Sequence, residues 1–338
     1  MGYYKLEYIW IDGLGKPRSK TKVVNRLYNN INDLPEWNYD GSSTSQATGS
    51  DSEVIIKPKA WFPDPFRGAD KFGHKLVLCD TYLPNGDPHP TNTRVIAEKI
   101  FNFNKELKPR FGIEQEFFLS KDGRPIGLPI NKKNPPPQGN YYCGTGAENI
   151  YGRECIENAF DNCLKAGLNL TGLNSEVAPS QWEFQIDEYG INVCDQLYIM
   201  RYILDRTAEN YGWCIDFYPK PVDGDWNGSG CHINFSTGPM RNVETSGYEE
   251  ILNAIKKLEK NHLKHMKHYG EGNEKRMTGL HETAKYDEFT YGVANRGASV
   301  RIPRETERLK CGYFEDRRPS SNMDPYIATS LIFETCCL

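Results

Sequence analysis

The sequence predicts an α+β fold with a smaller N-terminal part and a larger C-terminal part. Three observations support this prediction: the length of 338 residues, a strand-rich beginning, and a later mixture of helices with short strands. Domains usually contain about 100–200 residues, so this length suits two of them. Because prolines punctuate the segment from Pro84 to Pro90, we expect domains at residues 1–84 and 85–338.

The N-terminal part is expected to contain at least two strands and a polar loop. Tyr3–Asp12 is rich in aromatic and β-branched residues, and Gly13 and Pro17 follow it. Lys75–Tyr82 has the same character. Between them, Glu36–Thr44 is rich in turn-forming residues, which predicts a loop.

The C-terminal part is expected to contain four long helices between its strands. In the first two, apolar residues recur at helical spacing, and each of the last three is followed by a glycine that favours a helix end. The expected helices are Thr91–Lys108, Glu148–Ala166, Asp195–Tyr211 and Tyr248–Tyr269. Three consecutive prolines, Pro135–Pro137, predict a stiff loop.

The overall composition excludes several classes of protein. Forty-one Lys and Arg against forty-five Asp and Glu give a net charge of −4, which disfavours nucleic acid as a partner. No apolar run approaches the ~20 residues of a membrane span, and the N-terminus lacks the plan of a signal peptide. Ten cysteines without a C-x-x-C pair indicate reduced, mostly buried thiols. We therefore expect a cytoplasmic protein without membrane partners.

An alternating segment, Phe111–Phe117, places two carboxylates together. Side chains two apart on a strand share a face, so Glu114 and Glu116 would lie side by side, opposite Ile113. Two carboxylates this close repel each other unless a cation lies between them. The alternative is an ordinary solvated strand face.

Two further segments alternate in the same way. Ser180–Ile186 places Glu183 on the polar face, and Glu176 lies seven residues earlier; Gly230–Ser236 places His232 on its polar face. If these strands are neighbours, one face holds several carboxylates and an imidazole. Such oxygen-rich ligation suits Mg²⁺ or Mn²⁺ better than zinc. Spacing alone leaves open whether the strands are adjacent.

Arginines and histidines in the C-terminal third allow two interpretations. Arginine binds carboxylates and phosphates in bidentate fashion, but surface ion pairing is the ordinary alternative for each one. The arginines are Arg276, Arg296, Arg301, Arg304, Arg317 and Arg318. Three histidines with a spacing of three, His262, His265 and His268, are expected to form a solvated helix face.

Five segments together resemble the glutamine synthetase family, with the closest match to its eukaryotic (type II) form. They are Asn38–Thr44, Gly112–Glu116, Gln181–Gln185, Asn227–His232 and Gly312–Pro319. The resemblance runs in order over nearly the whole chain. It implies a small N-terminal β-grasp domain and a larger α+β catalytic domain, whose curved antiparallel sheet forms a funnel-like site. It also implies ATP-dependent ligation of glutamate and ammonia to glutamine through γ-glutamyl phosphate.

The resemblance assigns roles to individual residues. Two or more Mg²⁺ or Mn²⁺ ions would be held by two groups of side chains: Glu116, Glu176 and Glu183, and Glu114, His232 and Glu315. Glutamate would contact Arg276, Arg296, Arg317 and the loop Asp225, Trp226, Asn227 and Gly228. ATP would contact Asn234, Ser236, Arg301 and Tyr313. The ammonium pocket would comprise Asp40, Ser43, Tyr142 and Glu282.

Three of these residues would act in catalysis. Asp40 would attract ammonium and take its proton, Arg296 would neutralise charge on the transferred phosphoryl group, and Glu282 would cover the intermediate against water. In the family the site lies between two subunits, so Asp40 would act across an interface. The resemblance implies a homo-oligomer, a decamer of two pentameric rings.

Two other functions remain open. A guanidino kinase shares a related catalytic fold, but it gives no reason for the Asn38–Thr44 loop or the Glu114 and Glu116 pair. A non-catalytic relative kept for structural or regulatory binding would be expected to lack a metal ligand, and every ligand position is filled. The complete set of charged residues favours an enzyme, because burying it without cations would be costly.

Overall fold

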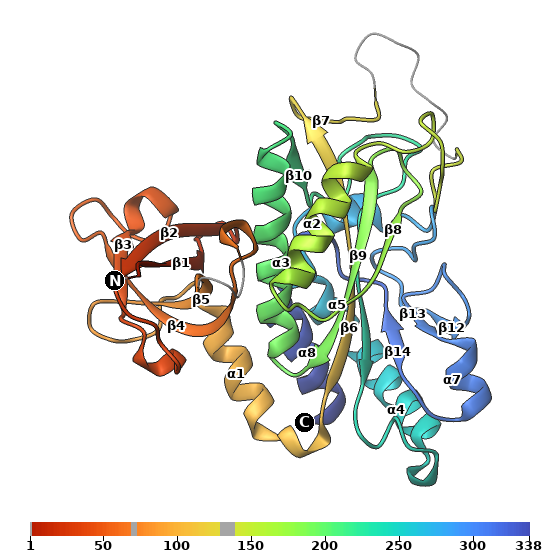
Figure 1. The fold of residues 1–338 in the computed structure, drawn as a ribbon. Coiled ribbons are helices and arrows are strands. Elements are labelled where there is room, and N and C mark those ends of the chain that lie inside the picture. Colours follow the sequence, from red (N-terminus) through yellow and green to blue (C-terminus); the bar gives the residue numbers. More distant parts are fainter. Residues whose placement is uncertain (1, 69–72, 129–138) are drawn as a thin grey trace.

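The computed structural model describes residues 2–68, 73–128 and 139–338, and the loop predicted at Pro135–Pro137 lies outside these ranges. Two β-sheets lie on opposite sides of a group of helices (Figure 1). The smaller sheet comes from the N-terminal part of the chain and the larger one from the C-terminal part. This architecture agrees with the expected α+β fold.

The smaller sheet has five strands in the order β2-β1-β5-β4-β3. Strands β1 and β5 are parallel, whereas the other neighbours are antiparallel. The strands are β1 (Tyr4–Ile11), β2 (Pro17–Val24), β3 (Trp37–Asp40), β4 (Glu53–Pro63) and β5 (Lys75–Tyr82). Both predicted strands are confirmed as β1 and β5, and the mixed sheet agrees with the expected β-grasp domain.

The predicted loop at Glu36–Thr44 was wrong in its first half. Trp37–Asp40 forms β3, an edge strand that pairs with β4, and Gly41–Thr44 forms a short 3₁₀ turn. The ring of Tyr39 stacks on that of Trp10, with centroids 4.3 Å apart. Tertiary packing of the aromatic residues therefore outweighs the turn propensity of their neighbours.

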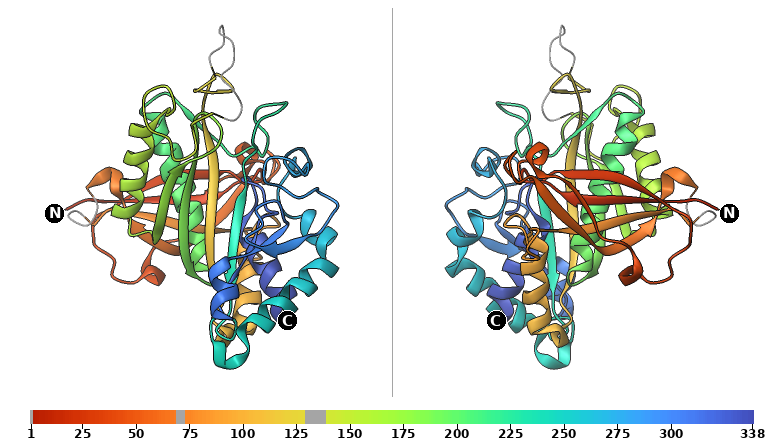
Figure 2. Two further views of the ribbon diagram at one scale, coloured as in Figure 1. Left: turned by 90° about the vertical axis from the view of Figure 1, so that its right-hand side faces the viewer. Right: turned by 90° about the vertical axis from the view of Figure 1, so that its left-hand side faces the viewer.

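The larger sheet has nine strands, and seven of them follow the path β12-β13-β14-β11-β6-β9-β8. All of its pairs are antiparallel except β12 with β13. Figure 2 shows that this sheet is strongly curved. Its strands are β6 (Arg110–Lys121), β7 (Arg124–Pro125), β8 (Leu170–Ser175), β9 (Gln181–Tyr189), β10 (Cys214–Asp216), β11 (Cys231–Ser236), β12 (Tyr291–Val293), β13 (Val300–Ile302) and β14 (Phe314–Asp316).

One face of the larger sheet forms the main hydrophobic core. Ile113, Phe184 and Ile233 are almost fully buried there, and each such side chain contributes about 1.5–3 kcal/mol. Ile9 and Leu78 of the smaller sheet join the same cluster. The helices that contribute to this cluster include α1 (Thr93–Phe103), α2 (Arg153–Lys165), α3 (Asn192–Glu209), α4 (Gly247–Lys260) and α8 (Pro325–Cys337). Because the apolar side chains point to this core, their polar neighbours are directed to the opposite face.

The predicted helices exist, but several of their ends differ. Helix α1 ends at Phe103, and α2 begins only after Gly152, whose φ of 82° is left-handed. The single helix predicted at Tyr248–Tyr269 is divided at Asn261 into α4 (Gly247–Lys260) and α5 (His262–Met266). Two short helices, α6 (Asn273–Arg276) and α7 (Arg304–Leu309), follow.

The prediction of a solvated histidine face was wrong for two of the three residues. His262 is 6% exposed and His265 is fully buried, whereas His268 is exposed. His265 hydrogen-bonds to the hydroxyl groups of Tyr269 and Thr335. Six of the ten cysteines are buried, which agrees with the expectation of mostly buried thiols.

Candidate active site

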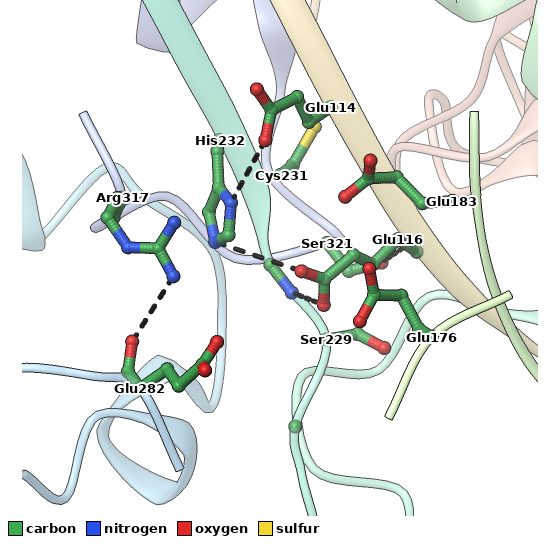
Figure 3. Close-up of polar contacts among 12 residues, drawn as sticks. Glu114, Glu116, Glu176, Glu183, Ser229, Cys231, His232, Glu282, Arg317 and Ser321 are labelled. Atoms are coloured by element: carbon green, nitrogen blue, oxygen red, sulfur yellow. Dashed lines mark hydrogen bonds and ion pairs between the residues drawn. The ribbon is translucent and has the colours of Figure 1, made fainter. Parts of the chain in front are cut away.

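Adjacent strands bring the predicted acidic residues together on the polar face of the larger sheet (Figure 3). Glu116 on β6 lies directly opposite Glu183 on β9, and Glu114 lies opposite His232 on β11. Glu315 on β14 completes the row, because β14 pairs with the other side of β11. The adjacency that spacing left open is therefore confirmed.

The first candidate metal group is Glu114, His232 and Glu315. His232 Nδ1 lies 3.5 Å from a Glu114 carboxylate oxygen and 3.4 Å from Glu315 Oε1. One ligand atom from each residue lies within 4.8 Å of the others. His232 Nδ1 is buried without a hydrogen-bond partner, and burial together with nearby Arg317 holds the pKa of His232 well below its ordinary value. A neutral imidazole between two carboxylates is a fitting donor set for a divalent cation.

The second candidate group is Glu116, Glu176 and Glu183. Burial and mutual repulsion raise the pKa of each of these carboxyl groups to about 8. The backbone N–H of Gly230 donates to Glu116 Oε2 at 2.8 Å. Gln181, which the sequence interpretation did not assign to this role, donates to the same oxygen at 3.1 Å. Buried carboxyl groups this close together are suited to bind a cation, which would displace their protons.

The arginines divide between the site, the core and the surface. Arg317 Nη1 donates to Glu315 Oε1 at 2.6 Å, and Arg301 donates to the other oxygen of the same carboxylate. Arg276 is buried and binds backbone carbonyls, including that of Arg318 at 2.7 Å. The alternative of surface ion pairing is right for Arg304, whose side chain is 74% exposed beside Glu307.

Arg318 lies in the core, and Arg296 lies on the surface. Arg318 is fully buried in the core, where it forms a bidentate pair with Asp316. Arg296 is exposed on the loop before β13, and its backbone carbonyl accepts from Arg317 Nε at 3.0 Å. Arg317 and Arg318 are neighbours in an extended segment and point to opposite faces, but alternation alone does not tell which of the two faces the site.

A pocket of about 450 Å³ lies beside the first metal group. Among the residues predicted for ATP, Asn234, Ser236 and Tyr313 line it, whereas Arg301 is engaged with Glu315. Asn234 Nδ2 donates to Glu114 Oε1 at 2.8 Å, which joins the pocket to the acidic group. The pocket also contains polar residues that the sequence interpretation missed, namely Arg110, Asp187 and Arg241.

One of the missed residues had a signal in the sequence. Asp187 continues the alternation of Glu183 and Gln185 along β9, so the same argument could have included it. It accepts from Arg110 Nε at 2.6 Å. Arg241 follows β11 in a loop, where it donates to Ser236, and no periodic pattern marks it.

Two loops carry further residues that the sequence assigns to the site. Asp225 is exposed and lies 2.9 Å from His281 Nε2, while Trp226 and Asn227 are buried. Gly228 is required by close packing, because a Cβ there would lie 2.4 Å from the Pro219 carbonyl oxygen. Glu282 is exposed, and its backbone carbonyl accepts from Arg317 at 3.3 Å (Figure 3).

Two predicted residues lie apart from the acidic groups. Asp40 and Ser43 belong to the smaller sheet and its following turn, on the far side of the helices (Figure 1). The carboxylate of Asp40 accepts from Ser42 and Ser43, and these hydrogen bonds lower its pKa. The side chain of Tyr142 is 53% exposed. Its pKa is raised first by its partial burial and then by nearby Cys143 and Glu176. A single chain therefore does not bring Asp40 to the acidic groups.

In the part of the chain that the structure describes, no helix is both long and apolar enough to cross a bilayer. Comparison with family models gives two matches. Residues 3–84 match the model described as glutamine synthetase, beta-Grasp domain, and residues 90–250 match that of the glutamine synthetase catalytic domain.

Whole-chain comparisons lead to the same family. A glutamine synthetase nodule isozyme of Lupinus luteus is 53% identical, with 98% of this chain and 94% of the relative covered. Glutamine synthetase cytosolic isozymes of Glycine max and Medicago sativa are 52% identical, with 98% of this chain and 93% of each relative covered. The fold, the acidic site and these similarities together place the chain in the glutamine synthetase family, in its eukaryotic form.

Proposed function

We propose that this protein catalyses the ATP-dependent ligation of glutamate and ammonia to glutamine. The observation that carries this proposal is the convergence of five glutamates and His232 beside a polar pocket of about 450 Å³. A catalytic domain at residues 85–338 would hold this site, and a domain at residues 1–84 would supply Asp40 and Ser43 of the ammonium pocket. Family membership supports this function over a guanidino kinase, and no observation favours a non-catalytic role.

The reaction begins with activation of a carboxylate, which is a poor electrophile because its charge repels nucleophiles. An oxygen of the glutamate γ-carboxylate attacks the γ-phosphorus of ATP, and ADP leaves with the bonding electrons. Arg317 and Arg296 would neutralise charge on the substrate carboxylates and the transferred phosphoryl group, and Arg276 would hold the glutamate. Asp225, Trp226, Asn227 and Gly228 would enclose the amino-acid end of the substrate.

Ammonia then completes the reaction. Asp40 would accept a proton from ammonium, with Ser43 and Tyr142 beside it, and the free ammonia attacks the carbonyl carbon of γ-glutamyl phosphate. The carbon–oxygen bond to phosphate breaks, phosphate leaves with the bonding electrons, and the nitrogen loses its extra proton, which the released phosphate can accept. Glu282 would cover the intermediate during this step, because water would otherwise hydrolyse it.

Two groups of side chains would hold divalent cations: Glu114, His232 and Glu315, and Glu116, Glu176 and Glu183. Magnesium or manganese bound there would neutralise charge on the phosphates of ATP. The orphaned Nδ1 of His232 and the raised pKa values of the second group support this assignment. Asn234, Ser236, Tyr313 and Arg301 would contact the nucleotide.

A complete site would need a second copy of the chain. Asp40 is exposed, its carboxylate accepts from Ser42 and Ser43, and it ends β3 of the smaller sheet, which lies across the helices from the larger sheet (Figure 1). We therefore propose that Asp40 serves the site of a neighbouring subunit in a homo-oligomer, a decamer of two pentameric rings as the resemblance implies. The relatives named cytosolic isozymes support a cytoplasmic location.

An omission assay tests the proposed function. The protein is supplied with ATP and Mg²⁺, and glutamate and ammonium are each present or omitted. We expect phosphate release and glutamine formation to require both substrates. Absence of turnover in a folded oligomer would contradict the proposal, and nucleotide binding would then test the non-catalytic alternative.

A further inference from the structure

The loop that carries Glu282 is closed at its base by backbone contacts. We call residues 277–286 the Glu282 loop. The backbone N–H of Tyr286 donates to the Met277 carbonyl at 3.0 Å, and Thr278 and Lys285 form a β-bridge. At the tip, His281 and Glu282 both adopt left-handed backbone angles, with φ of 52° and 59°. Since non-glycine residues rarely adopt this conformation, the tip depends on a firmly held base.

The N-terminal side of this base is fixed through Arg276. The Thr283 hydroxyl donates to the Arg276 carbonyl at 3.3 Å. The buried guanidinium of Arg276 donates in turn to the Arg318 carbonyl at 2.7 Å. The loop is thereby connected to the segment that directly follows β14.

The C-terminal side of the base is fixed through His262. One ring nitrogen of His262, Nε2, lies 3.0 Å from the Tyr286 carbonyl oxygen, and the other lies 3.1 Å from Arg318 Nη1. A guanidinium can only donate, so Nδ1 of His262 must accept. Nε2 therefore carries the ring proton and donates it to the Tyr286 carbonyl. Arg318 thus determines the tautomer that anchors the loop.

Arg318 is itself rigidly held. It is fully buried, and it donates to both carboxylate oxygens of Asp316 at 2.8 and 2.7 Å. The hydroxyl of Tyr269 donates to Asp316 at 2.8 Å. Glu315 and Arg317 alternate with this pair along the chain and contact each other on the site face. One short segment therefore supports the acidic site on one side and both ends of the Glu282 loop on the other.

We propose that His262 and Arg318 are positioning residues that hold the Glu282 loop in a fixed position relative to Glu315 and Arg317. Neither side chain is assigned to a substrate, and His262 would act only through Tyr286. The inference rests on the proposed function, in which Glu282 protects γ-glutamyl phosphate from water. A loosened base would let water reach the intermediate, so that ATP is consumed without formation of glutamine.

The variant His262→Phe tests this proposal, with His268→Phe as a matched control at an exposed histidine. Phenylalanine retains a ring against Phe289, whose centroid lies 5.7 Å from that of His262, but removes both ring nitrogens. We expect hydrogen exchange in residues 278–286 to become about two- to tenfold faster, as for the loss of one buried hydrogen bond. We also expect more than one phosphate released per glutamine, with the KM for ATP unchanged. The control should match the parent protein in all three measurements.

A folded His262→Phe variant with parental exchange rates and one phosphate per glutamine would overturn the proposal. If that variant does not fold, His262→Leu replaces it, because leucine also removes both ring nitrogens and keeps an apolar side chain beside Phe289. Its exchange and phosphate ratio should also rise, and parental values would again overturn the role of His262. The exchange measurement needs no turnover, so an inactive parent protein would reject the proposed function without deciding the anchoring of the loop.

Discussion

Glu116 and Glu183 lie directly opposite each other on neighbouring antiparallel strands, and both carboxyl groups are buried. Like charges in this relation destabilise a sheet. Burial first, and then the surrounding glutamates, raise the pKa of each group to about 8 from an ordinary 4.5. The pair is therefore stable only when it is protonated or when a cation replaces the protons.

This relationship predicts an unusual pH dependence of stability. Between pH 4.5 and 8 the folded protein without metal binds more protons at Glu116, Glu176 and Glu183 than the unfolded chain does. The free energy of unfolding must therefore fall as the pH rises through this range. We expect a loss of about 2–5 kcal/mol between pH 5 and 8, measured by urea unfolding in the presence of a chelator.

Saturating Mg²⁺ or Mn²⁺ should cancel most of that loss, because a bound cation holds the carboxylates in their charged form. The release of protons on metal addition at pH 7 provides an independent check by calorimetry in two buffers. Equal slopes with and without metal would contradict a cation site at this pair.

Removal of the imidazole should weaken metal binding specifically. In His232→Gln the buried nitrogen between Glu114 and Glu315 is lost, so we expect at least a tenfold lower affinity for Mn²⁺. The measurement is titration followed by electron paramagnetic resonance. His268→Gln, at an exposed position, is the control, and equal affinities in the two variants would count against His232 as a ligand.

Gly230 should not tolerate even a methyl group. A Cβ there would lie 2.6 Å from His232 Nε2, whereas at Gly297 the nearest atom would be 3.5 Å away. We expect Gly230→Ala to displace the imidazole and the N–H that binds Glu116, with at least a tenfold loss of Mn²⁺ affinity. Gly297→Ala should retain the parental affinity. A Gly230→Ala variant that binds Mn²⁺ normally would show that the backbone here is more adaptable than this geometry implies.

Loss of the Asp40 carboxylate should affect the ammonia step more than ATP binding. We expect Asp40→Ala to raise the KM for ammonium at least tenfold, since a charge-assisted contact and a proton acceptor are both removed. The KM for ATP should change less than twofold. Asp40→Asn retains an acceptor for the N–H of Ser42. It therefore distinguishes the effect of losing the charge from the effect of disrupting the turn. Unchanged ammonium dependence in both variants would reject the role of Asp40.

Mixing two variants that are each impaired at low ammonium or low metal concentration tests whether this contact crosses an interface. If Asp40 serves a neighbouring site, hybrids of Asp40→Ala with His232→Gln subunits should contain some sites with both wild-type residues. We therefore expect activity to return after the two proteins are dissociated and reassembled together. Failure of every reassembled hybrid, with parental protein recovering fully, would indicate that Asp40 acts within its own chain.

Strand alternation predicted the most about this site, and for a clear physical reason. Glu114, Glu116, Glu183 and His232 are assigned to polar faces because apolar residues of the same strands occupy the opposite faces. Alternation identifies the face but not the neighbouring strand. The adjacency of β6, β9, β11 and β14 therefore needed the structure.

Other features depend on tertiary contacts that local patterns do not encode. His262 and His265 were expected in solvent because their spacing is that of a helix face, but buried Arg318 and Tyr269 provide partners for them in the core. The helix break at Asn261 and the strand at Trp37–Asp40 are similarly determined by packing. Arg241 lines the pocket of about 450 Å³ from a loop that has no periodic pattern.

Transfer of labelled oxygen tests the central claim most directly. Glutamate that carries ¹⁸O in its γ-carboxylate is incubated with the protein, ATP, Mg²⁺ and ammonium, and the released phosphate is analysed by mass spectrometry. If the carboxylate attacks the γ-phosphorus, one labelled oxygen must pass to phosphate for each glutamine formed. Unlabelled phosphate accompanied by glutamine would contradict activation through γ-glutamyl phosphate at this site.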